Sequence, residues 1–388
     1  MRAAHALIAG LLLSTPLQAA ERLLVGLDGK LFFEAAGPRN GPPGTDAVAV
    51  VDLSDPAQPR LAGSLPLANS VAGPPTNLQI TPDGKLGLVA SSLMNQPKDK
   101  APDGTAAFAA VPDDALHVID LAATPPKLLE TIKVGRMPSG VAIRKQGDLA
   151  LVANRAGKSV SVLSIQGGAV KQVAEVGVDD EVAAVVISPD GTRAFVAKNT
   201  AHKVGVLRIE GATVTYDKAW DMPVGLGVYN LDMTPDGRLV LAANTGVGGD
   251  GHTDTLSVID AQATPPRVVD HVTVGDGPEG MAISPDGRHA IAVLLRGTAA
   301  VHTAWSYGPV GAVVLLGIAE GRVRVLNQVD AGNLPEGVAV SADGRYAYVG
   351  NYLDRSLPVF RIDGDRIVDT GTKLALPGQP ASVRGMAR

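Results

Sequence analysis

The 388-residue chain contains no cysteine, and aromatic side chains make up only 3% of it. Without cysteine the chain can form no disulfide, can use no thiolate chemistry and can bind no metal or cluster through sulfur. Its stability must therefore come from buried apolar surface, and a chain of this length can bury enough. The scarcity of aromatics, with 45 glycines and 28 prolines, is typical of an all-β protein that has many tight turns.

Strong net charge and long apolar runs are also lacking. The formal charge is −5 without blocks of one sign, so we expect neither nucleic acid nor an anionic membrane as a partner. A basic start, a short apolar run over 6–13 and small residues before Glu21 predict a secretory signal over 1–20. We predict one exported domain over 21–388, periplasmic or secreted and without a membrane span. The alternative is an amphipathic N-terminal helix of a cytosolic protein.

One short motif recurs along the chain. Its clearest copy, residues 278–288 (PEGMAISPDGR), has alternating apolar residues followed by Pro285-Asp286-Gly287. The alternation predicts a strand, and Pro, Asp and Gly suit successive positions of a tight turn, so each copy predicts a β-hairpin. The turn glycines are Gly84, Gly147, Gly191, Gly237, Gly287 and Gly344.

The spacing of these turns predicts a propeller. The shortest interval, from Gly147 to Gly191, is 44 residues, which fits one four-stranded blade per repeat. The segment before the first copy has three strands but no innermost strand, and residues 378–386 resemble the start of one. We therefore predict an all-β, seven-bladed propeller whose C-terminus supplies the innermost strand of the N-terminal blade, closing the ring. An alternative register makes Leu27-Asp28-Gly29 the turn of that blade.

The insertions between repeats are predicted to gather on one side of the disc. Residues 27–45, 90–114, 244–254 and 295–309 all connect the second and third strands of a blade, and such connections leave from one end. We call this side the decorated face and expect functional groups there, because loops on a rigid scaffold carry them. The opposite side, the turn face, carries the Pro-Asp-Gly turns and is expected to have little room for a site.

The ends of the second strands carry a family resemblance. Residues 151–154 (LVAN), 241–244 (LAAN) and 348–351 (YVGN), with the preceding Pro-Asp-Gly elements, resemble the YVTN-type repeats of lactonase-like seven-bladed propellers. The resemblance implies one candidate function, the hydrolysis of a sugar lactone of the gluconolactone type at the top of the channel on the decorated face. The alternative is a non-catalytic propeller that binds a ligand or a protein in the periplasm, and the sequence leaves open whether the protein is an enzyme.

One feature of the resemblance is missing. Cytoplasmic phosphogluconolactonases of this group carry an Arg-His pair before an aromatic residue in the innermost strand. This chain has Glu279-Gly280-Met281 and Glu336-Gly337-Val338 at those positions, which argues against a phosphosugar substrate.

Four residues are candidates for catalysis. Glu279 and Glu336 occupy equivalent positions at the inner rim, where a carboxylate could activate water against a lactone carbonyl. His252 and His302 fall in loops of the decorated face and could act as acid, base or metal ligand. The simpler interpretations are turn chemistry for the Pro-Glu-Gly segments and solvated loop positions for the histidines.

Other polar and aromatic residues are candidates for binding a ligand. Asparagines placed beside the glutamates would add polar groups to the channel, which could hold a polyol or a divalent metal. Basic residues near the strand ends could hold a carboxylate or an oxyanion, and aromatics could stack on a sugar or hold loops in place. The candidates are Asn77, Asn230, Arg296, Arg355, Trp305, Tyr307 and Tyr352, with Arg155, Lys198 and Tyr229 in the same groups.

Cofactor and partners are only loosely specified. No metal-binding motif defines a ligand set, and no motif for covalent haem attachment is present. We expect a monomer whose partner is a small molecule such as a sugar lactone, or a periplasmic protein.

Overall fold

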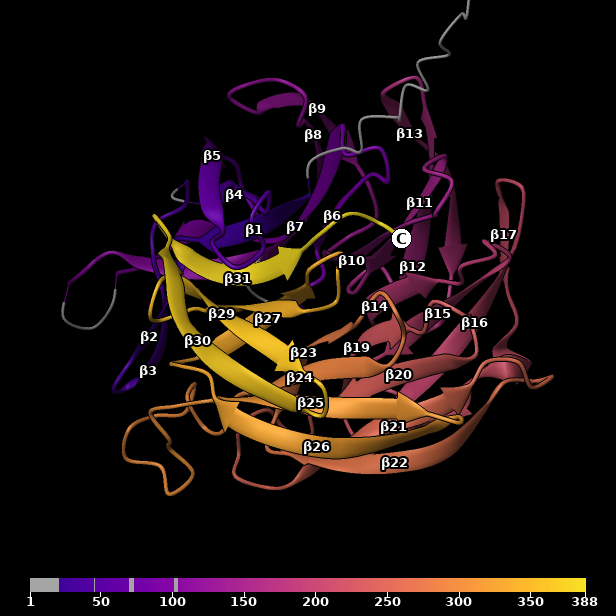
Figure 1. Cartoon of the computed structure of the whole chain (residues 1–388). Helices are drawn as coiled ribbons and strands as arrows, with labels where there is room; N and C mark the ends of the chain where they lie inside the picture. Colours follow the sequence, from indigo (N-terminus) through magenta and orange to yellow (C-terminus); the bar gives the residue numbers. More distant parts are fainter. Residues whose placement is uncertain (1–20, 45, 70–72, 101–103) are drawn as a thin grey trace, which may run out of the picture.

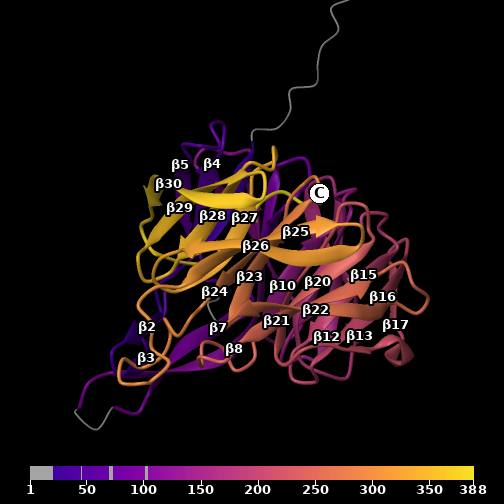
Figure 2. The ribbon, with the colours of Figure 1, turned by 60° about the horizontal axis from the view of Figure 1, so that its bottom comes forward.

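The computed structural model describes residues 21–44, 46–69, 73–100 and 104–388. These residues form seven four-stranded antiparallel blades around a central channel (Figures 1 and 2), which confirms the predicted fold. One short 3-10 helix, η1 (Lys218–Trp220), accompanies the strands of the described residues. No helix in these ranges has the length and apolar character needed to cross a membrane. The predicted signal segment over 1–20 lies outside the described residues.

The blades are numbered along the chain, and their strands are given from the channel outward. Blade 1 contains β31 (Gln379–Arg384), β1 (Arg22–Asp28), β4 (Ala47–Asp52) and β5 (Arg60–Pro66); blade 2 contains β6 (Leu78–Ile80), β7 (Leu86–Lys98), β8 (Ala107–Asp120) and β9 (Lys127–Lys133); blade 3 contains β10 (Pro138–Ile143), β11 (Leu149–Asn154), β12 (Ser159–Gln166) and β13 (Ala169–Gly177). Blade 4 contains β14 (Val182–Ile187), β15 (Arg193–Lys198) and β16 (Lys203–Glu210). Its outermost strand is divided into β17 (Thr213–Tyr216) and β18 (Met222–Pro223), which pair with different parts of β16. Blade 5 contains β19 (Val228–Met233), β20 (Leu239–Asn244), β21 (Asp254–Asp260) and β22 (Arg267–Gly275); blade 6 contains β23 (Pro278–Ile283), β24 (His289–Leu294), β25 (Ala312–Ala319) and β26 (Arg322–Asp330); blade 7 contains β27 (Pro335–Val340), β28 (Tyr346–Asn351), β29 (Ser356–Asp363) and β30 (Arg366–Ala375).

The Pro-Asp-Gly motif makes the turn between the two innermost strands of a blade. In blade 6 the Ser284 hydroxyl donates to Asp286 (2.6 Å) and accepts the amide of His289 (3.0 Å). Gly287 has a φ of +71°, in the left-handed region that favours glycine. Equivalent Ser/Thr-to-Asp bonds close the turns of blades 2, 4, 5 and 7. The repeat is therefore a local folding unit.

Blade 1 is completed by the two ends of the chain, as predicted. Strand β31 lies beside β1 (Figure 1). Val383 of β31 pairs with Val25 of β1 and is fully buried. Beyond β31, Met386 bridges to Ile80 of β6, and Ala387 donates its amide to the Ile80 carbonyl (2.8 Å). The alternative register is wrong, because Asp28 ends β1 and its carboxylate accepts the amides that begin an inserted hairpin.

The insertions lie between the second and third strands of their blades, as predicted. Residues 27–45 contain the hairpin of β2 (Leu31–Glu34) and β3 (Gly37–Asn40), and residues 90–114 extend β7 and β8 beyond blade 2. Both project together from one side of the disc (Figure 2). The Asn95 amide of the second insertion donates to the carbonyls of Lys30 and Gly41 in the first (2.9 Å each), which joins them.

Buried charges anchor the first insertion. The Lys30 ammonium contacts the carboxylates of Asp28 (2.8 Å) and Asp46 (2.6 Å) and donates to the Asn69 carbonyl. The two aspartates are almost completely buried, so the hairpin is held to the blade by a desolvated ion cluster.

Val383→Asp tests the closure of the ring. The carboxylate would lie buried and unpaired between the N- and C-terminal strands, so we expect a loss of roughly 3–5 kcal/mol in the free energy of unfolding. Ala375→Asp, on the exposed edge strand β30, is the matched control and should change stability little. Chemical denaturation of both variants would measure this, and equal stabilities would contradict a closure that depends on β31.

Candidate functional site

Two glutamates from neighbouring blades meet in the channel. Glu279 and Glu336 are the second residues of β23 and β27, and each lies where a register shift interrupts pairing with the next strand. A Cβ on Gly280 would lie 2.1 Å from the Glu336 carbonyl oxygen, so only glycine permits this approach of the two strands. The Pro-Glu-Gly segment thus places the two carboxyl groups together.

The two glutamate side chains influence each other's protonation. Glu336 is 4% exposed, and one of its carboxyl oxygens is unpartnered in the described structure. Burial raises the pKa of Glu279 to about 7, and burial with the neighbouring Glu279 charge raises the pKa of Glu336 well above its usual range. Near neutral pH, Glu336 therefore holds the proton and Glu279 is poised between its two forms.

Arg155 and Tyr229 lie beside this pair. The Arg155 guanidinium lies 5.6 Å from the centre of the Tyr229 ring and donates to the Asn199 side chain (2.9 Å). The Arg155 charge lowers the pKa of Glu279 and partly offsets the effect of burial. Burial, assisted by the nearby charge of Glu279, raises the pKa of Tyr229, which stays a neutral donor. The cluster therefore combines a base, an acid and two hydrogen-bond donors.

The residues that take the place of Glu279 in the other six blades differ in size and chemistry. Glu279 lies five residues before Ser284, which begins its turn, and the same offset in blade 5 gives Tyr229. Glu279, Glu336 and Tyr229 are thus contributed by three consecutive blades. The equivalent residues of the other blades are small: Thr76, Ser139, Ala183 and Ala381.

Asn77 and Asn230 lie one position later than predicted. They are equivalent to Gly280 rather than to Glu279, and both are almost completely buried. Asn230 donates to the Glu279 carbonyl (3.3 Å) and Asn77 to the Ala90 carbonyl (2.9 Å), while each side-chain oxygen lacks a protein partner in the described structure. Both asparagines therefore support the ring of channel residues through its backbone.

The loop histidines and two aromatics form pairs outside the glutamate cluster. His252 contacts Asp250 (3.1 Å) and lies edge-on to Trp305, which is 80% exposed. His302 lies against Tyr307, with 4.2 Å between ring centres. In the described residues no hydrogen bond, ion pair or ring contact joins either pair to the glutamates.

The remaining candidates have different surroundings. Arg296 is paired with Asp330 (3.0 Å), and Arg355 is exposed with a φ of +48°. Tyr352 is fully buried and donates to Asp28 (2.9 Å) and to the Leu31 carbonyl (2.7 Å). Its ring is therefore packed beneath the inserted hairpin and holds that loop in place.

The turn-face end of the channel contains a cavity of about 510 Å³, contrary to the expectation that this face has little room. Its lining includes Asp232, Arg384 and Arg388, and neither Glu279 nor Glu336 is part of it. Within the described ranges no group of three or more acidic or histidine side chains is arranged to hold a metal ion.

Comparison with known proteins supports the fold more than any activity. No family model matches the chain. Antigen Lp49 of Leptospira interrogans is 31% identical over 106 residues, which cover 25% of this chain and 21% of the antigen. The chain therefore matches only about a fifth of the length of this curated relative.

Solved structures resemble nearly the whole chain at low identity. A provisionally assigned 6-phosphogluconolactonase from Bacteroides fragilis has a TM-score of 0.71 at 17% identity, covering 96% of this chain and 99% of its own. The periplasmic gluconolactonase PpgL of Pseudomonas aeruginosa has a TM-score of 0.63 at 19% identity, covering 95% and 99%. Kuenenia stuttgartiensis hydrazine synthase also matches, with a TM-score of 0.61 at 19% identity, covering 82% and 91%. The chain has the fold of lactonase-like seven-bladed propellers, and the YVTN-type assignment stays a prediction.

The raised pKa values of Glu279 and Glu336 predict an unusual pH dependence of stability. The folded pair binds protons more tightly than the unfolded chain, so its contribution is fully present at low pH and is lost as pH rises through about 7. Between pH 5 and pH 8 we expect this pair to lower the free energy of unfolding by about 1–3 kcal/mol.

Denaturation at the two pH values, in wild type and in a Glu279→Gln/Glu336→Gln variant, measures this contribution. The double variant should lose this part of the pH dependence. Glu130→Gln, on the exposed strand β9, is the control and should retain it. If the free energy of unfolding changed as much between pH 5 and pH 8 in the double variant as in wild type, the glutamates would titrate normally.

Proposed function

We propose that the protein is an exported hydrolase that opens a sugar lactone in the channel beside Glu279. The observation that carries this proposal is the pair of Glu279 and Glu336, whose pKa values are both raised, with Arg155 and Tyr229 beside it. Lactone hydrolysis needs a base to activate water, donors for the oxyanion and an acid for the leaving oxygen. The cluster supplies each of these.

In the proposed reaction, the Glu279 carboxylate removes a proton from a water molecule whose oxygen attacks the lactone carbonyl carbon. The Arg155 guanidinium and the Tyr229 hydroxyl stabilise the negative charge that forms on the carbonyl oxygen. As the tetrahedral intermediate collapses, the bond to the ring oxygen breaks and Glu336 protonates that oxygen. The proton held by Glu279 then passes to Glu336, which restores the pair and leaves a hydroxy acid as product.

The surroundings of each group suit its proposed role. A base with a pKa of about 7 is partly ionised at neutral pH and still basic enough to accept a proton from attacking water. Glu336, kept protonated by burial and by Glu279, can donate a proton at the same pH. Blades 3 and 4 have the small residues Ser139 and Ala183 at the position of Glu279. The side of the channel that faces the glutamates is therefore the least bulky.

The predicted loop candidates have a secondary place in this proposal. Trp305 and Tyr307, which flank His252 and His302, would contact the sugar as it approaches the decorated face. Arg296 and Arg355 on the same face would attract a polar substrate. The fold shared with a periplasmic gluconolactonase, together with the predicted signal over 1–20, supports an exported enzyme of this class.

Hydrolysis of D-glucono-1,5-lactone above the spontaneous rate tests the proposal. We expect wild-type kcat/KM to rise with an inflection near pH 7, because ionisation of Glu279 creates the base. Glu279→Gln should lower kcat by at least ~10²-fold, the usual contribution of a positioned base. Glu130→Gln is again the control, and several aldonolactones should be compared.

Failure of the wild-type protein to accelerate any of these lactones would refute the proposal. A Glu279→Gln variant with full activity would remove the glutamate from the mechanism even if lactones were hydrolysed.

A non-catalytic binding module is the second candidate. Leu226, Val247 and Trp305 are exposed large apolar side chains in loops of the decorated face, and apolar groups on such loops often contact partners. This alternative gains support if the lactone assays are negative while the protein is folded.

A further inference from the structure

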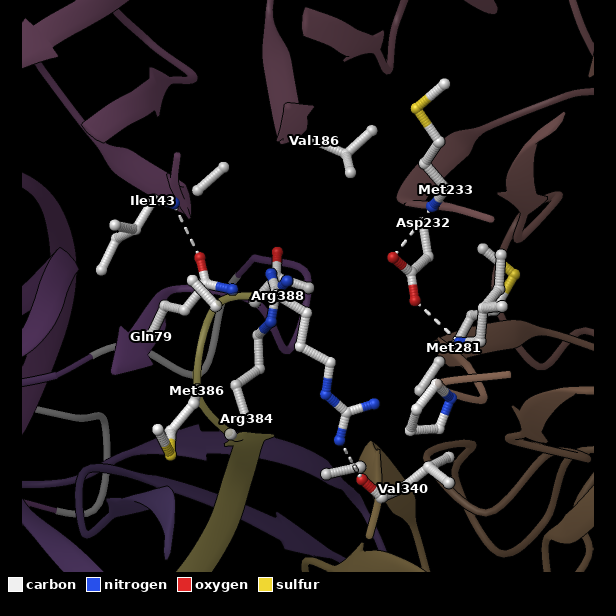
Figure 3. Close-up of a pocket in the computed structure, with 18 of the residues that line it drawn as sticks. Gln79, Ile143, Val186, Asp232, Met233, Met281, Val340, Arg384, Met386 and Arg388 are labelled. Carbon is white, nitrogen blue, oxygen red and sulfur yellow. Dashed lines mark hydrogen bonds between the residues drawn. The ribbon is translucent and has the colours of Figure 1, made fainter. Parts of the chain in front are cut away.

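The cavity at the turn-face end of the channel is chemically distinct from the glutamate cluster. Side chains from the innermost strands of several blades surround it, and the C-terminal segment after β31 passes along it (Figure 3). Much of its wall is apolar, with Val186, Met233, Met281 and Val340 around the space. Its volume of about 510 Å³ is large enough for a small organic molecule.

Arg384 brings a guanidinium into this apolar space without an adequate partner. It is the last residue of β31, and its side chain extends toward the middle of the cavity (Figure 3). Its one hydrogen bond is a long contact of 3.4 Å from Nη1 to the Val141 carbonyl. Across the described residues no carboxylate lies within ion-pair distance of it. Desolvation lowers the pKa of Arg384, and the charge of Asp232 raises it in part.

Asp232 lies across the cavity from Arg384 but does not neutralise it. Its two carboxylate oxygens accept the amides of Met233 (2.9 Å) and Ile283 (2.7 Å), which hold it against the opposite wall (Figure 3). Arg388 uses its guanidinium to hold the Val340 carbonyl (2.8 Å). Neither group therefore occupies the hydrogen-bonding positions of Arg384.

Gln79 places a second donor on the Arg384 side. Its side-chain oxygen accepts the amide of Ile143 (2.8 Å), which fixes the orientation of the side-chain amide. Gln79 and Arg384 both line the cavity (Figure 3). Gln79 is 8% exposed, and its side-chain nitrogen has no hydrogen-bond partner among the described residues. A guanidinium and an amide donor that line the same cavity can both donate to a planar, two-oxygen anion.

We infer that this cavity binds a small organic monocarboxylate. Its carboxylate group accepts hydrogen bonds from Arg384 and Gln79, and its short apolar body packs against Met233, Met281 and Val186. The anion supplies the ion-paired carboxylate that Arg384 lacks, while Asp232 at the far wall disfavours a second negative charge. The site lies at the end of the channel away from Glu279, so this inference does not depend on the proposed hydrolysis.

Titration calorimetry with hexanoate, and with the neutral hexanamide as the matched probe, tests the inference on the full chain. We expect hexanoate to bind at least tenfold more tightly than hexanamide, which corresponds to about 1.4 kcal/mol. Arg384→Gln should remove most of this difference, and Arg384→Lys should retain only part of it because it loses the planar fork. Arg345→Gln, on an exposed turn, is the control and should bind like wild type.

Two results would overturn the inference. One is equal binding, or no binding at millimolar concentrations, of hexanoate and hexanamide to wild type, a comparison that needs no variant to fold. The other is unchanged hexanoate affinity in a folded Arg384→Gln protein. Glu279→Gln should bind hexanoate normally, which separates this site from the proposed catalytic cluster.

Discussion

Pairing of β31 with β1 is the constraint on which the rest of the structure depends. Six blades carry their own innermost strand, but the first must borrow its strand from the C-terminus. This closure fixes Arg384 inside the channel and seats blade 7 against blade 1. A Cβ on Gly337 would lie 2.5 Å from the Val383 amide nitrogen, so the neighbouring strands meet in van der Waals contact at the seam. A closed ring has no open sheet edge, and its channel residues are therefore held at fixed distances.

Close strand contact also explains the chemistry at the two ends of the channel. Gly280, after the first glutamate, lets its strand approach Glu336, and burial of the two neighbouring carboxyl groups raises the pKa of both. At the other end the closing strand contributes an arginine without a carboxylate partner. The channel thus carries the two glutamates toward the decorated face, and Arg384, Arg388 and Asp232 toward the turn face. One scaffold can in this way present two sites that favour different molecules.

The sequence predicted the fold well because each turn is a local unit. Ser284, Asp286 and Gly287 determine a hairpin through contacts within a few residues, and the repeat length then determines the blade. The glutamates were found from their position in the repeat. The same offset from the turn also identifies Tyr229, which the sequence analysis grouped only with other aromatics.

Other features depend on distances that no repeat encodes. Burial of Tyr352 follows from the hairpin packed above it, and the space around Arg384 follows from the radius of the ring. For this reason the sequence predicted little room for a site on the turn face.

Direct titration of the glutamate side chains tests the central claim, that burial raises the pKa of both Glu279 and Glu336. Carbon-detected NMR of protein labelled at the glutamate carboxyl carbons, with Glu279→Gln and Glu336→Gln used for assignment, would follow each group. The structure predicts that Glu279 titrates near pH 7 and that Glu336 stays protonated to higher pH. Two independent titrations close to pH 4.5 would contradict the raised pKa values and the site built upon them.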